Sequence, residues 1–281
     1  MVNVVGIGNA GCKIAECLAQ YPQYKIHKID TGLPKRKGNF PVRKRSATEE
    51  YEENFPRKIF SDLQKIKGDV LLIVGGGGSI SSCTLKVMEA LKENETEIVY
   101  IKPELSFLTD EGASLDRVTF NVLQEYARSG ILERLYIVSN SEIEKAVGQL
   151  PVARYYEKIN EIISSTLHMI NVYKNSSPTL SNIKEMSGIS RIFAIGIGTL
   201  ENTRDQMFYP LLHPDEKIYY FAINETRLEE DADLLPRIKL RIQQEDSTIN
   251  TSFGVYPTSY KENYIYILAN TKIIQGVNYD E

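Results

Sequence analysis

The sequence predicts an α/β protein with a doubly wound parallel sheet, a long central helix and a smaller α/β unit after it. Through the first 150 residues, short apolar, β-branched runs alternate with amphipathic segments of helical period, which is the pattern of parallel strands joined by crossover helices. One unbroken helical pattern covers residues 151–171, and a second series of alternating elements follows it. We therefore expect three parts: residues 1–150, a central helix within 151–175, and residues 176–281.

The individual elements follow from the same periodicity, with turn-forming residues between them. The predicted strands cover residues 2–5, 25–29, 70–74, 97–101, 135–138, 191–197, 217–223, 249–256 and 264–270. The predicted helices cover residues 12–20, 56–66, 84–92, 115–129, 151–171, 180–186, 205–212 and 230–245. Residues 257–263 are expected to form a hairpin turn between the last two strands.

Composition and charge exclude several classes of protein. The 281 residues carry a net charge of -4, so nothing indicates direct binding of nucleic acid, although residues 35–45 hold six basic residues in eleven. Cys12, Cys17 and Cys83 show neither disulfide nor zinc spacing, which favours a reducing compartment. Because there is no run of about 18 apolar residues and no signal-peptide pattern, we expect a cytoplasmic protein without a membrane partner.

Two glycine-rich turns each follow a predicted strand and precede a helix. Residues 6–11 (GIGNAG) form a GxGxxG, and residues 75–78 are four glycines that lead into a Ser-rich helix start at residues 79–82. Glycine lets backbone N–H groups face a ligand, and hydroxyl groups at a helix start can cap or donate, so both turns predict an anion site. Asp30 ends the second strand 19 residues beyond Gly11, which is the spacing of a ribose-binding acid in a dinucleotide fold.

The two glycine turns, the long helix and the smaller α/β unit together resemble the FtsZ/tubulin family of GTP-binding cytoskeletal proteins, across essentially the whole chain. Residues 6–11 look like the family's first glycine loop. Residues 76–82 (GGGSISS) stand where the family has GGGTGTG/S, with Ile80 and Ser82 in place of glycines. These two replacements are expected to narrow the pocket or to alter its phosphate contacts. The resemblance implies GTP or GDP as the ligand and allows for Mg²⁺ as its companion, while no metal-ligating residue is predicted.

Further residues match the family's nucleotide site in order. Residues 102–117 resemble the stretch around the ribose, where Glu111 is the ribose-binding acid, and residues 137–141 (IVSNS) resemble IPND, where Asn140 approaches the ribose or the base. Tyr156 and Asn160 share one face of the long helix, which suits stacking on guanine and hydrogen bonding to its edge, although such a tyrosine can also pack between domains. The nucleotide-binding residues that the resemblance implies are Gly6, Gly8, Asn9, Ala10, Gly11, Cys12, Asp30, Gly76, Gly77, Gly78, Ser79, Ile80, Ser81, Glu111, Asn140, Tyr156 and Asn160.

The segment after the long helix departs from the family. Members of the family place the acidic residues of an NxDxxD loop in the next subunit's pocket, where they orient the water that attacks GTP. Here residues 175–185 (NSSPTLSNIKE) put Thr179 and Asn182 where acids are expected, and Glu185 lies one turn further on. Uncharged groups do not polarise water as a carboxylate does, and loss of a water-orienting group costs about two to three decades in rate. We therefore expect weak or absent GTP hydrolysis.

The leading hypothesis is a cytoplasmic protein that binds a guanine nucleotide and self-associates head to tail into filaments. The alternative is a non-polymerising relative that serves as a binding or regulatory module. A third hypothesis, an NAD-dependent oxidoreductase, rests on the GxGxxG and Asp30, and the second glycine turn opposes it. Only seven residues follow Ile274, so we expect the long C-terminal tail of division-type members to be missing, which favours a plasmid, viral or specialised cytoskeletal role.

Overall fold

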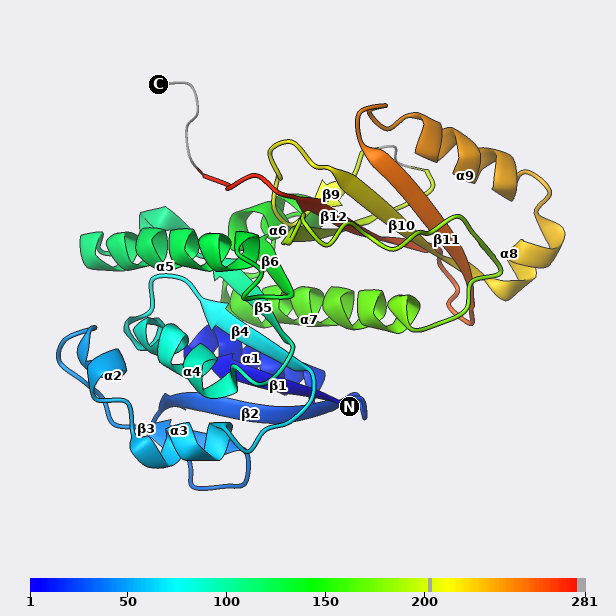
Figure 1. Cartoon of the computed structure of the whole chain (residues 1–281). Helices are drawn as coiled ribbons and strands as arrows, with labels where there is room; N and C mark the ends of the chain where they lie inside the picture. The colour runs from blue at the N-terminus through cyan, green and yellow to red at the C-terminus, as the bar shows by residue number, and fades with distance from the viewer. Residues whose placement is uncertain (202–203, 277–281) are drawn as a thin grey trace, which may run out of the picture.

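The computed structural model describes residues 1–201 and 204–276, and Figure 1 shows how its helices and strands are arranged. Within these residues the strands form one mixed sheet in the order β3-β2-β1-β4-β5-β6-β8-β12-β10-β11-β7, with β9 paired to β8. The strands are β1 (Val2–Ile7), β2 (Tyr24–Thr31), β3 (Asn39–Val42), β4 (Val70–Gly75), β5 (Thr96–Lys102), β6 (Arg134–Ser139), β7 (Leu180–Ser181), β8 (Ile192–Gly198), β9 (Gln206–Met207), β10 (Glu216–Asn224), β11 (Asn250–Thr258) and β12 (Tyr264–Thr271). The helices are α1 (Gly8–Leu18), α2 (Glu50–Glu53), α3 (Arg57–Leu63), α4 (Thr84–Leu91), α5 (Asp110–Arg128), α6 (Asn140–Val147), α7 (Tyr155–Lys174), α8 (Glu225–Glu230) and α9 (Leu234–Gln243), with short 3-10 turns η1 (Ser79–Cys83), η2 (Leu105–Phe107) and η3 (Val152–Arg154).

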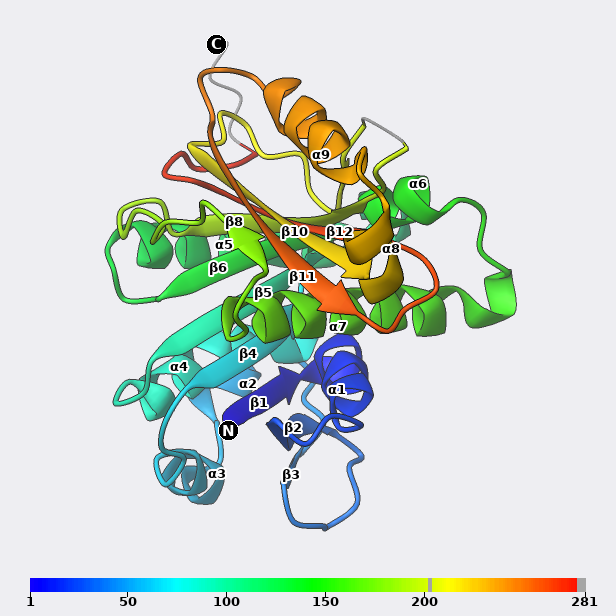
Figure 2. The same cartoon turned by 90° about the vertical axis from the view of Figure 1, so that its right-hand side faces the viewer.

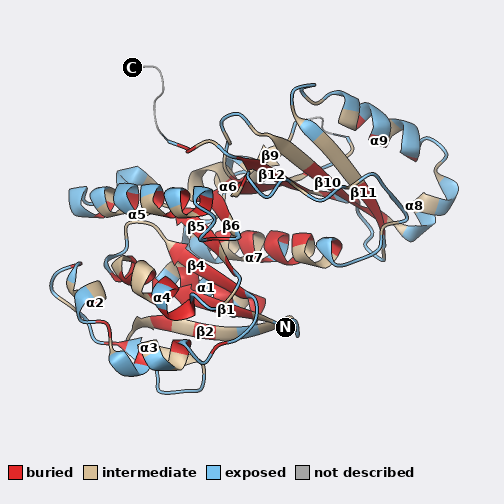
Figure 3. Cartoon of the chain, in the orientation of Figure 1, coloured by how far each residue is buried: buried red, intermediate tan, exposed pale blue. Residues whose placement is uncertain are grey.

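The first half of the sheet is parallel. Strands β3, β2, β1, β4, β5 and β6 run in one direction, and β8 continues that direction beside β6. One face packs on α2 to α5 through a core that includes Leu63 and Phe120. The other face packs on α1, α6 and α7 through a core that includes Ile14 and Ile163. Helices on both faces of a parallel sheet confirm the doubly wound α/β prediction, and Figure 3 shows the buried strands between them.

The long central helix is confirmed as α7, and it joins the two halves of the sheet. Its buried face, which includes Ile159 and Ile170, shares one core with Ile73 of β4 and Tyr220 of β10. Figures 1 and 2 show α7 lying between α1 and the strands of the second half. The helix begins at Tyr155, four residues later than predicted, because the preceding residues form the 3-10 turn η3.

The predicted hairpin between the last two strands is wrong. Strand β10 lies between them, paired in parallel with β11 and antiparallel with β12. A parallel pair cannot be closed by a tight turn, so α8 and α9 form the crossover from β10 to β11. Residues 257 and 258 belong to β11, and residues 259–263 lead past β10 to β12.

Three predicted helices of the second half also need correction. Residues 180–186 contain the short strand β7 followed by an irregular segment, because Leu180 and Ser181 pair with β11. Residues 205–212 contain β9, which pairs with β8, and are otherwise irregular. Residues 230–245 contain only the last residue of α8 and then α9, because the Asp231 carboxylate accepts a hydrogen bond from the Asp233 N–H and the chain turns there.

The end of the described chain returns to the first half. After β12, the Gln275 backbone N–H donates to Oε1 of Gln124 on α5 at 2.6 Å, and the Gln124 side chain donates back to the Gln275 carbonyl at 3.1 Å. Both glutamines are fully buried. Residues 272–276 therefore form a strap that fastens the second half of the protein to α5.

Two further features concern the cysteines and the helices. The three cysteines are free thiols, of which Cys12 and Cys83 are buried and Cys17 is half-buried. None of the helices in residues 1–201 and 204–276 combines the length and the apolar character that a membrane crossing needs.

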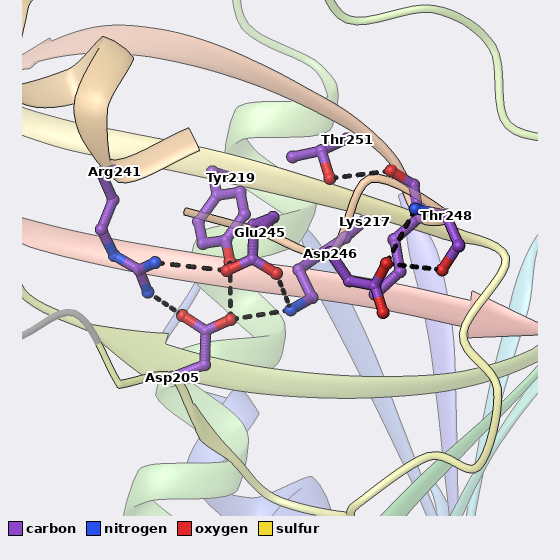
Figure 4. A network of polar contacts seen from close by, with 9 residues as sticks. Asp205, Lys217, Tyr219, Arg241, Glu245, Asp246, Thr248 and Thr251 are labelled. Carbon is purple, nitrogen blue, oxygen red and sulfur yellow. Dashed lines mark hydrogen bonds and ion pairs between the residues drawn. The ribbon is translucent and has the colours of Figure 1, made fainter. Parts of the chain in front are cut away.

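A buried polar network holds α9 against β10 (Figure 4). Lys217 donates to Asp205 and Glu245 at 2.9 and 2.5 Å, and Arg241 also pairs with both carboxylates. The Tyr219 hydroxyl lies 2.6 Å from Asp205 and 2.5 Å from Glu245. Each carboxylate thus meets two cations and a hydroxyl, which satisfies charges that would otherwise be costly to bury.

This network predicts a loss of stability in acid that depends on Glu245. Burial alone would raise the pKa of the Glu245 carboxyl, but hydrogen bonds from Lys217 and Tyr219 and the nearby cations outweigh it and hold the pKa below its usual 4.5. A carboxyl with a lowered pKa stabilises the fold above its unfolded-state value, and this contribution disappears as the pH falls through the folded-state value. The unfolding free energy of the wild-type protein, measured by urea denaturation, should therefore fall as the pH drops below 4.5. In Glu245→Gln we expect this fall to be smaller, because the carboxyl that titrates is missing. The exposed Glu93→Gln variant is the control, and identical pH profiles for both variants would contradict the prediction.

Candidate functional site

The first glycine turn opens directly into α1 at the carboxyl end of β1. Gly8 has a φ of +69°, which glycine adopts without strain, and Ile7 provides no side-chain cap. The first turn of α1 contains no acidic residue. Among the described residues, none accepts a hydrogen bond from the backbone N–H of Asn9 or Ala10. The positive end of α1 therefore presents open N–H donors, which is the arrangement that binds anions.

The second glycine turn presents donors in the same way at the carboxyl end of β4. Gly77 has a φ of +72°, and η1 begins two residues later without a side-chain cap. The Gly76 N–H donates a hydrogen bond to the Ile101 carbonyl at 2.9 Å. The Gly78 N–H closes the turn over Gly76 and Gly77, whereas the Ser79 N–H meets no acceptor within residues 1–201 and 204–276.

Two of the serines hold the shape of this turn. The buried Ser81 hydroxyl donates to the Gly75 carbonyl at 2.6 Å, and the Ser82 hydroxyl donates to the Thr48 carbonyl at 2.6 Å. Their hydrogens are therefore already used, and only their oxygen lone pairs remain for a ligand. The exposed Ser79 hydroxyl makes no hydrogen bond to the described residues.

The two turns touch each other because β1 and β4 are neighbours. A Cβ atom added to Gly75 would lie 3.2 Å from the Ala10 Cβ, and one added to Gly8 would lie 2.9 Å from the Ile80 Cγ2. Ile80 is only 9% exposed and its side chain belongs to the core on the α2–α5 face. The isoleucine thus packs beneath the first turn, and the two sets of N–H donors form one surface.

A cavity of about 600 Å³ lies beside the first turn. It brings together five of the residues predicted from sequence, which come from α1, the start of α6 and the start of α7. Its lining residues are Asn9, Ala10, Lys13, Glu16, Cys17, Ile101, Asn140, Tyr156, Glu157 and Asn160. A cavity of this size suits a small-molecule ligand.

The Tyr156 ring is well placed to stack on a ligand. It is 60% exposed, and the Tyr155 ring packs edge-on against it with 5.1 Å between centroids. The Tyr155 hydroxyl in turn donates to Glu144 of α6 at 3.0 Å. Tyr155 thereby supports the Tyr156 ring from the side and leaves much of that ring open.

Five lining residues were missed by the sequence argument, namely Lys13, Glu16, Cys17, Ile101 and Glu157. Helical spacing could have found the first three, because they follow Asn9 at intervals of four, seven and eight residues and so share its face of α1. Lys13 and Glu16 form an exposed ion pair at 3.1 Å. Glu157 is the neighbour of Tyr156 and pairs with Arg154 at 2.7 Å.

The other twelve predicted nucleotide-binding residues lie outside this cavity: nine belong to the two glycine turns and the start of η1, and the remaining three are Glu111, Asp30 and Cys12. The Glu111 carboxylate accepts a hydrogen bond from Thr48 at 2.6 Å and lines a neighbouring cavity of about 500 Å³ together with Ser81. The Asp30 carboxylate accepts a hydrogen bond from the Thr31 N–H at 2.7 Å, and burial raises the pKa of this carboxyl. Burial, with the Asp30 charge, also raises the pKa of the Cys12 thiol to about 12, and the thiol donates weakly to the Gly6 carbonyl.

The predicted catalytic segment lies at the other end of α7. A helix of 20 residues spans about 30 Å, so the turn after Lys174 is far from the Tyr156 end of the same chain. The Thr179 N–H donates to the Val255 carbonyl at 2.8 Å, and Asn182 Oδ1 accepts from the Phe253 N–H at 2.7 Å. Glu185 is exposed. These contacts fasten the segment to the edge of β11, while the Thr179 and Glu185 side chains face solvent.

No protein-family model matches the sequence, and no curated protein matches it. Solved structures do match over most of the chain. The FtsZ dimer of M. jannaschii matches with a TM-score of 0.70 at 14% identity, covering 96% of this chain and 87% of FtsZ. CetZ from Methanosaeta thermophila matches with a TM-score of 0.71 at 12% identity, covering 98% and 87%. TubZ of Bacillus thuringiensis serovar israelensis, solved as a GTPγS-form protofilament, matches with a TM-score of 0.70 at 14% identity, covering 96% and 86%. The chain therefore has the FtsZ/tubulin fold, and the resemblance stated from sequence is confirmed at this level.

Gly76 offers a direct test of how tightly the second turn is built. A Cβ atom there would overlap the Asp116 carboxylate and crowd the Tyr100 hydroxyl and Pro103. We expect Gly76→Ala to lower the unfolding free energy by about 1–3 kcal/mol, as overpacking does. Gly188→Ala is the matched control, since a Cβ there meets nothing within 4 Å and should change stability by less than about 0.5 kcal/mol. Equal urea-denaturation midpoints for the two variants would contradict the close packing around Gly76.

Proposed function

We propose that this chain binds a guanine nucleotide, with its phosphates on the two glycine turns and its base in the cavity at the start of α7. The observation that carries the proposal is the contact between two uncapped, glycine-rich helix starts beside a cavity lined by Tyr156 and Asn160. Open backbone N–H groups suit phosphate oxygens. An exposed aromatic face suits a purine, and an amide suits the edge of a base.

The same residues fit a Mg²⁺ ion only as a companion of the nucleotide. In the described parts of the chain, no group of three or more His, Cys, Asp or Glu side chains is placed to hold a metal ion. Mg²⁺ usually keeps several waters and takes ligands from phosphate oxygens. We therefore propose that any Mg²⁺ is held chiefly by the phosphates, with the Ser79 hydroxyl as the nearest open side-chain oxygen of the turn.

We further propose head-to-tail self-association. The structure of TubZ is that of a protofilament, and TubZ has the same fold as this chain. In addition, large apolar side chains are exposed at both ends of α7: Val152, in the turn before its start, is 95% exposed, and Leu180, six residues beyond its end, is 43% exposed. Exposed apolar groups at two opposite ends favour a heterologous contact that repeats along one axis.

Hydrolysis is proposed to be weak. In such an assembly the segment of Thr179 and Asn182 is the part of one copy that would approach the next copy's nucleotide. Neither side chain carries a charge, and the Asn182 amide oxygen already accepts from Phe253. Glu185 is the nearest acid, six residues beyond Thr179. We expect the filament to be long-lived for this reason, and we propose a cytoplasmic location from the three free thiols.

Cys17 provides the first test of nucleotide binding. Burial raises the pKa of all three thiols, to about 12 for the buried Cys12 and Cys83, and Cys17 is the half-buried one that lines the cavity. We expect N-ethylmaleimide to modify Cys17 selectively at mildly alkaline pH, and GTP or GDP to slow this modification by about tenfold or more by covering the cavity. Mass spectrometry locates the label, and Cys17→Ser is the control. Unchanged labelling with GTP, or protection by NAD instead, would overturn the proposal.

Sedimentation tests assembly and hydrolysis together. We expect the protein to pellet with GTP at high concentration and to release phosphate slowly. Thr179→Asp restores a charged water-orienting group and should raise phosphate release from pelleted protein by about tenfold or more. Ser177→Asp, an exposed site in the same segment, is the control. Absence of pelleting favours the non-polymerising alternative, and brisk wild-type turnover in proportion to assembly contradicts weak hydrolysis.

A further inference from the structure

Helix α5 carries a buried carboxylate against the second glycine turn. Asp116 is only 1% exposed. Its Oδ1 accepts a hydrogen bond from the Tyr100 hydroxyl at 2.7 Å, and its Oδ2 accepts one from the Lys102 ammonium at 2.5 Å. Tyr100 and Lys102 both come from β5, so the carboxylate is tied to the strand that also receives the Gly76 N–H. Two different donors thus hold both oxygens of Asp116 in place.

This arrangement supports the turn from behind. Side chains alternate along β5, so Ile101 faces the cavity while Tyr100 and Lys102 face α5. The Asp116 carboxylate and the Tyr100 hydroxyl leave no room for a side chain at Gly76. They therefore define where the turn can lie and which way its following N–H groups point.

Asp116 cannot retreat, because α5 is fixed along its length. Phe120, one turn further on, packs on the Tyr100 ring with 5.5 Å between the two centroids. The Lys102 ammonium lies 4.3 Å from the centroid of the Phe120 ring. Two turns beyond Asp116, Gln124 is held by its paired hydrogen bonds with Gln275 in the strap. The strap therefore stiffens the helix that supports the turn.

The charge of Asp116 is neutralised at the same place. A carboxylate beside a phosphate site would repel the ligand, and Lys102 is the cation that pairs with it. The other titratable groups that interact with Asp116 in the described chain are Tyr100 and Tyr209. Burial first and the Asp116 charge second raise the pKa of both hydroxyls, so both remain neutral, and Tyr100 is the one that donates to Asp116.

We propose that Asp116 is the positioning residue of the second glycine turn, and that Lys102 keeps this carboxylate from repelling the phosphates of the bound nucleotide. This inference rests on the proposed nucleotide site. It assigns two separable roles: Asp116 fixes geometry, which any side chain of its shape can do, and Lys102 supplies charge balance, which is needed only while Asp116 is charged.

The experiment measures the affinities of GTP, GDP, GMP and guanosine by calorimetry, on protein freed of bound ligand. Lys102→Met should lower the affinity for GTP by about tenfold or more, because Coulomb repulsion grows with the charge on the ligand. The affinities for GDP and GMP should fall progressively less, and the affinity for guanosine should not change. The Lys102→Met/Asp116→Asn variant has the shape without the charge and should bind all four ligands within about threefold of wild type. Lys86→Met, which breaks an exposed ion pair on α4, is the control for loss of a lysine.

A second pair of variants isolates positioning. Lys102→Met/Asp116→Ala differs from Lys102→Met/Asp116→Asn only in the lost side-chain amide. It should bind GTP and GDP about tenfold more weakly, because the turn's N–H groups that contact the phosphate oxygens are displaced. Its affinity for guanosine should be unchanged. Thermal denaturation verifies that each variant is folded, and the two double variants remain informative if the unpaired carboxylate of Lys102→Met prevents folding.

The outcomes separate the two proposals. Wild-type protein that binds no guanine nucleotide overturns both. Wild-type binding with the two double variants alike overturns the positioning role of Asp116. A loss in Lys102→Met that is equal for guanosine and GTP overturns the charge-balancing role of Lys102 and leaves it as a packing residue.

Discussion

The site depends on how closely α1 can approach β1 and β4. A Cβ atom at Gly6 would overlap the Gly11 carbonyl, and one at Gly11 would overlap the Ile73 carbonyl in β4. Only two glycines allow this contact, because any side chain would push the helix away from the sheet. With α1 this close, its open N–H groups lie beside those of the second turn, and Asn9 and Ala10 meet the start of α7 across one cavity.

Helix α7 separates the cavity at its start from the segment that follows its end. Its start carries Tyr156 and Asn160 into the cavity, and its end carries the chain to the edge of β11 about 30 Å away. The helix is buried along one face by strands of both halves, so its two ends cannot swing toward each other. A residue after Lys174 can therefore reach the proposed nucleotide site only in another copy of the chain.

The sequence alone was sufficient for features that arise from short-range chemistry. The two glycine turns, the parallel strands before them and the face shared by Tyr156 and Asn160 depend on residue type and spacing within one element. It was insufficient where a distant partner decides the outcome. Strand β7 exists only because β11 offers it an edge, and Ile80 turns into the core because Gly8 leaves space there. Lys102 was taken only as a part of a motif, since nothing near it in sequence shows that its partner is Asp116, 14 residues away.

Binding and hydrolysis therefore depend on different kinds of residue, and sequence divergence affects them unequally. The phosphate contacts proposed here use backbone N–H groups, whose positions are set by glycines and by packing beneath the turns, so many side chains can change without removing a donor. The proposed water-orienting role belongs to individual side chains after the far end of α7, where one change from acid to amide removes the charge. A chain with about 14% identity to FtsZ can thus keep the fold and the open donors. In the proposed assembly, the neutral Thr179 and Asn182 then lower the rate of a hydrolysis that only the next copy could promote.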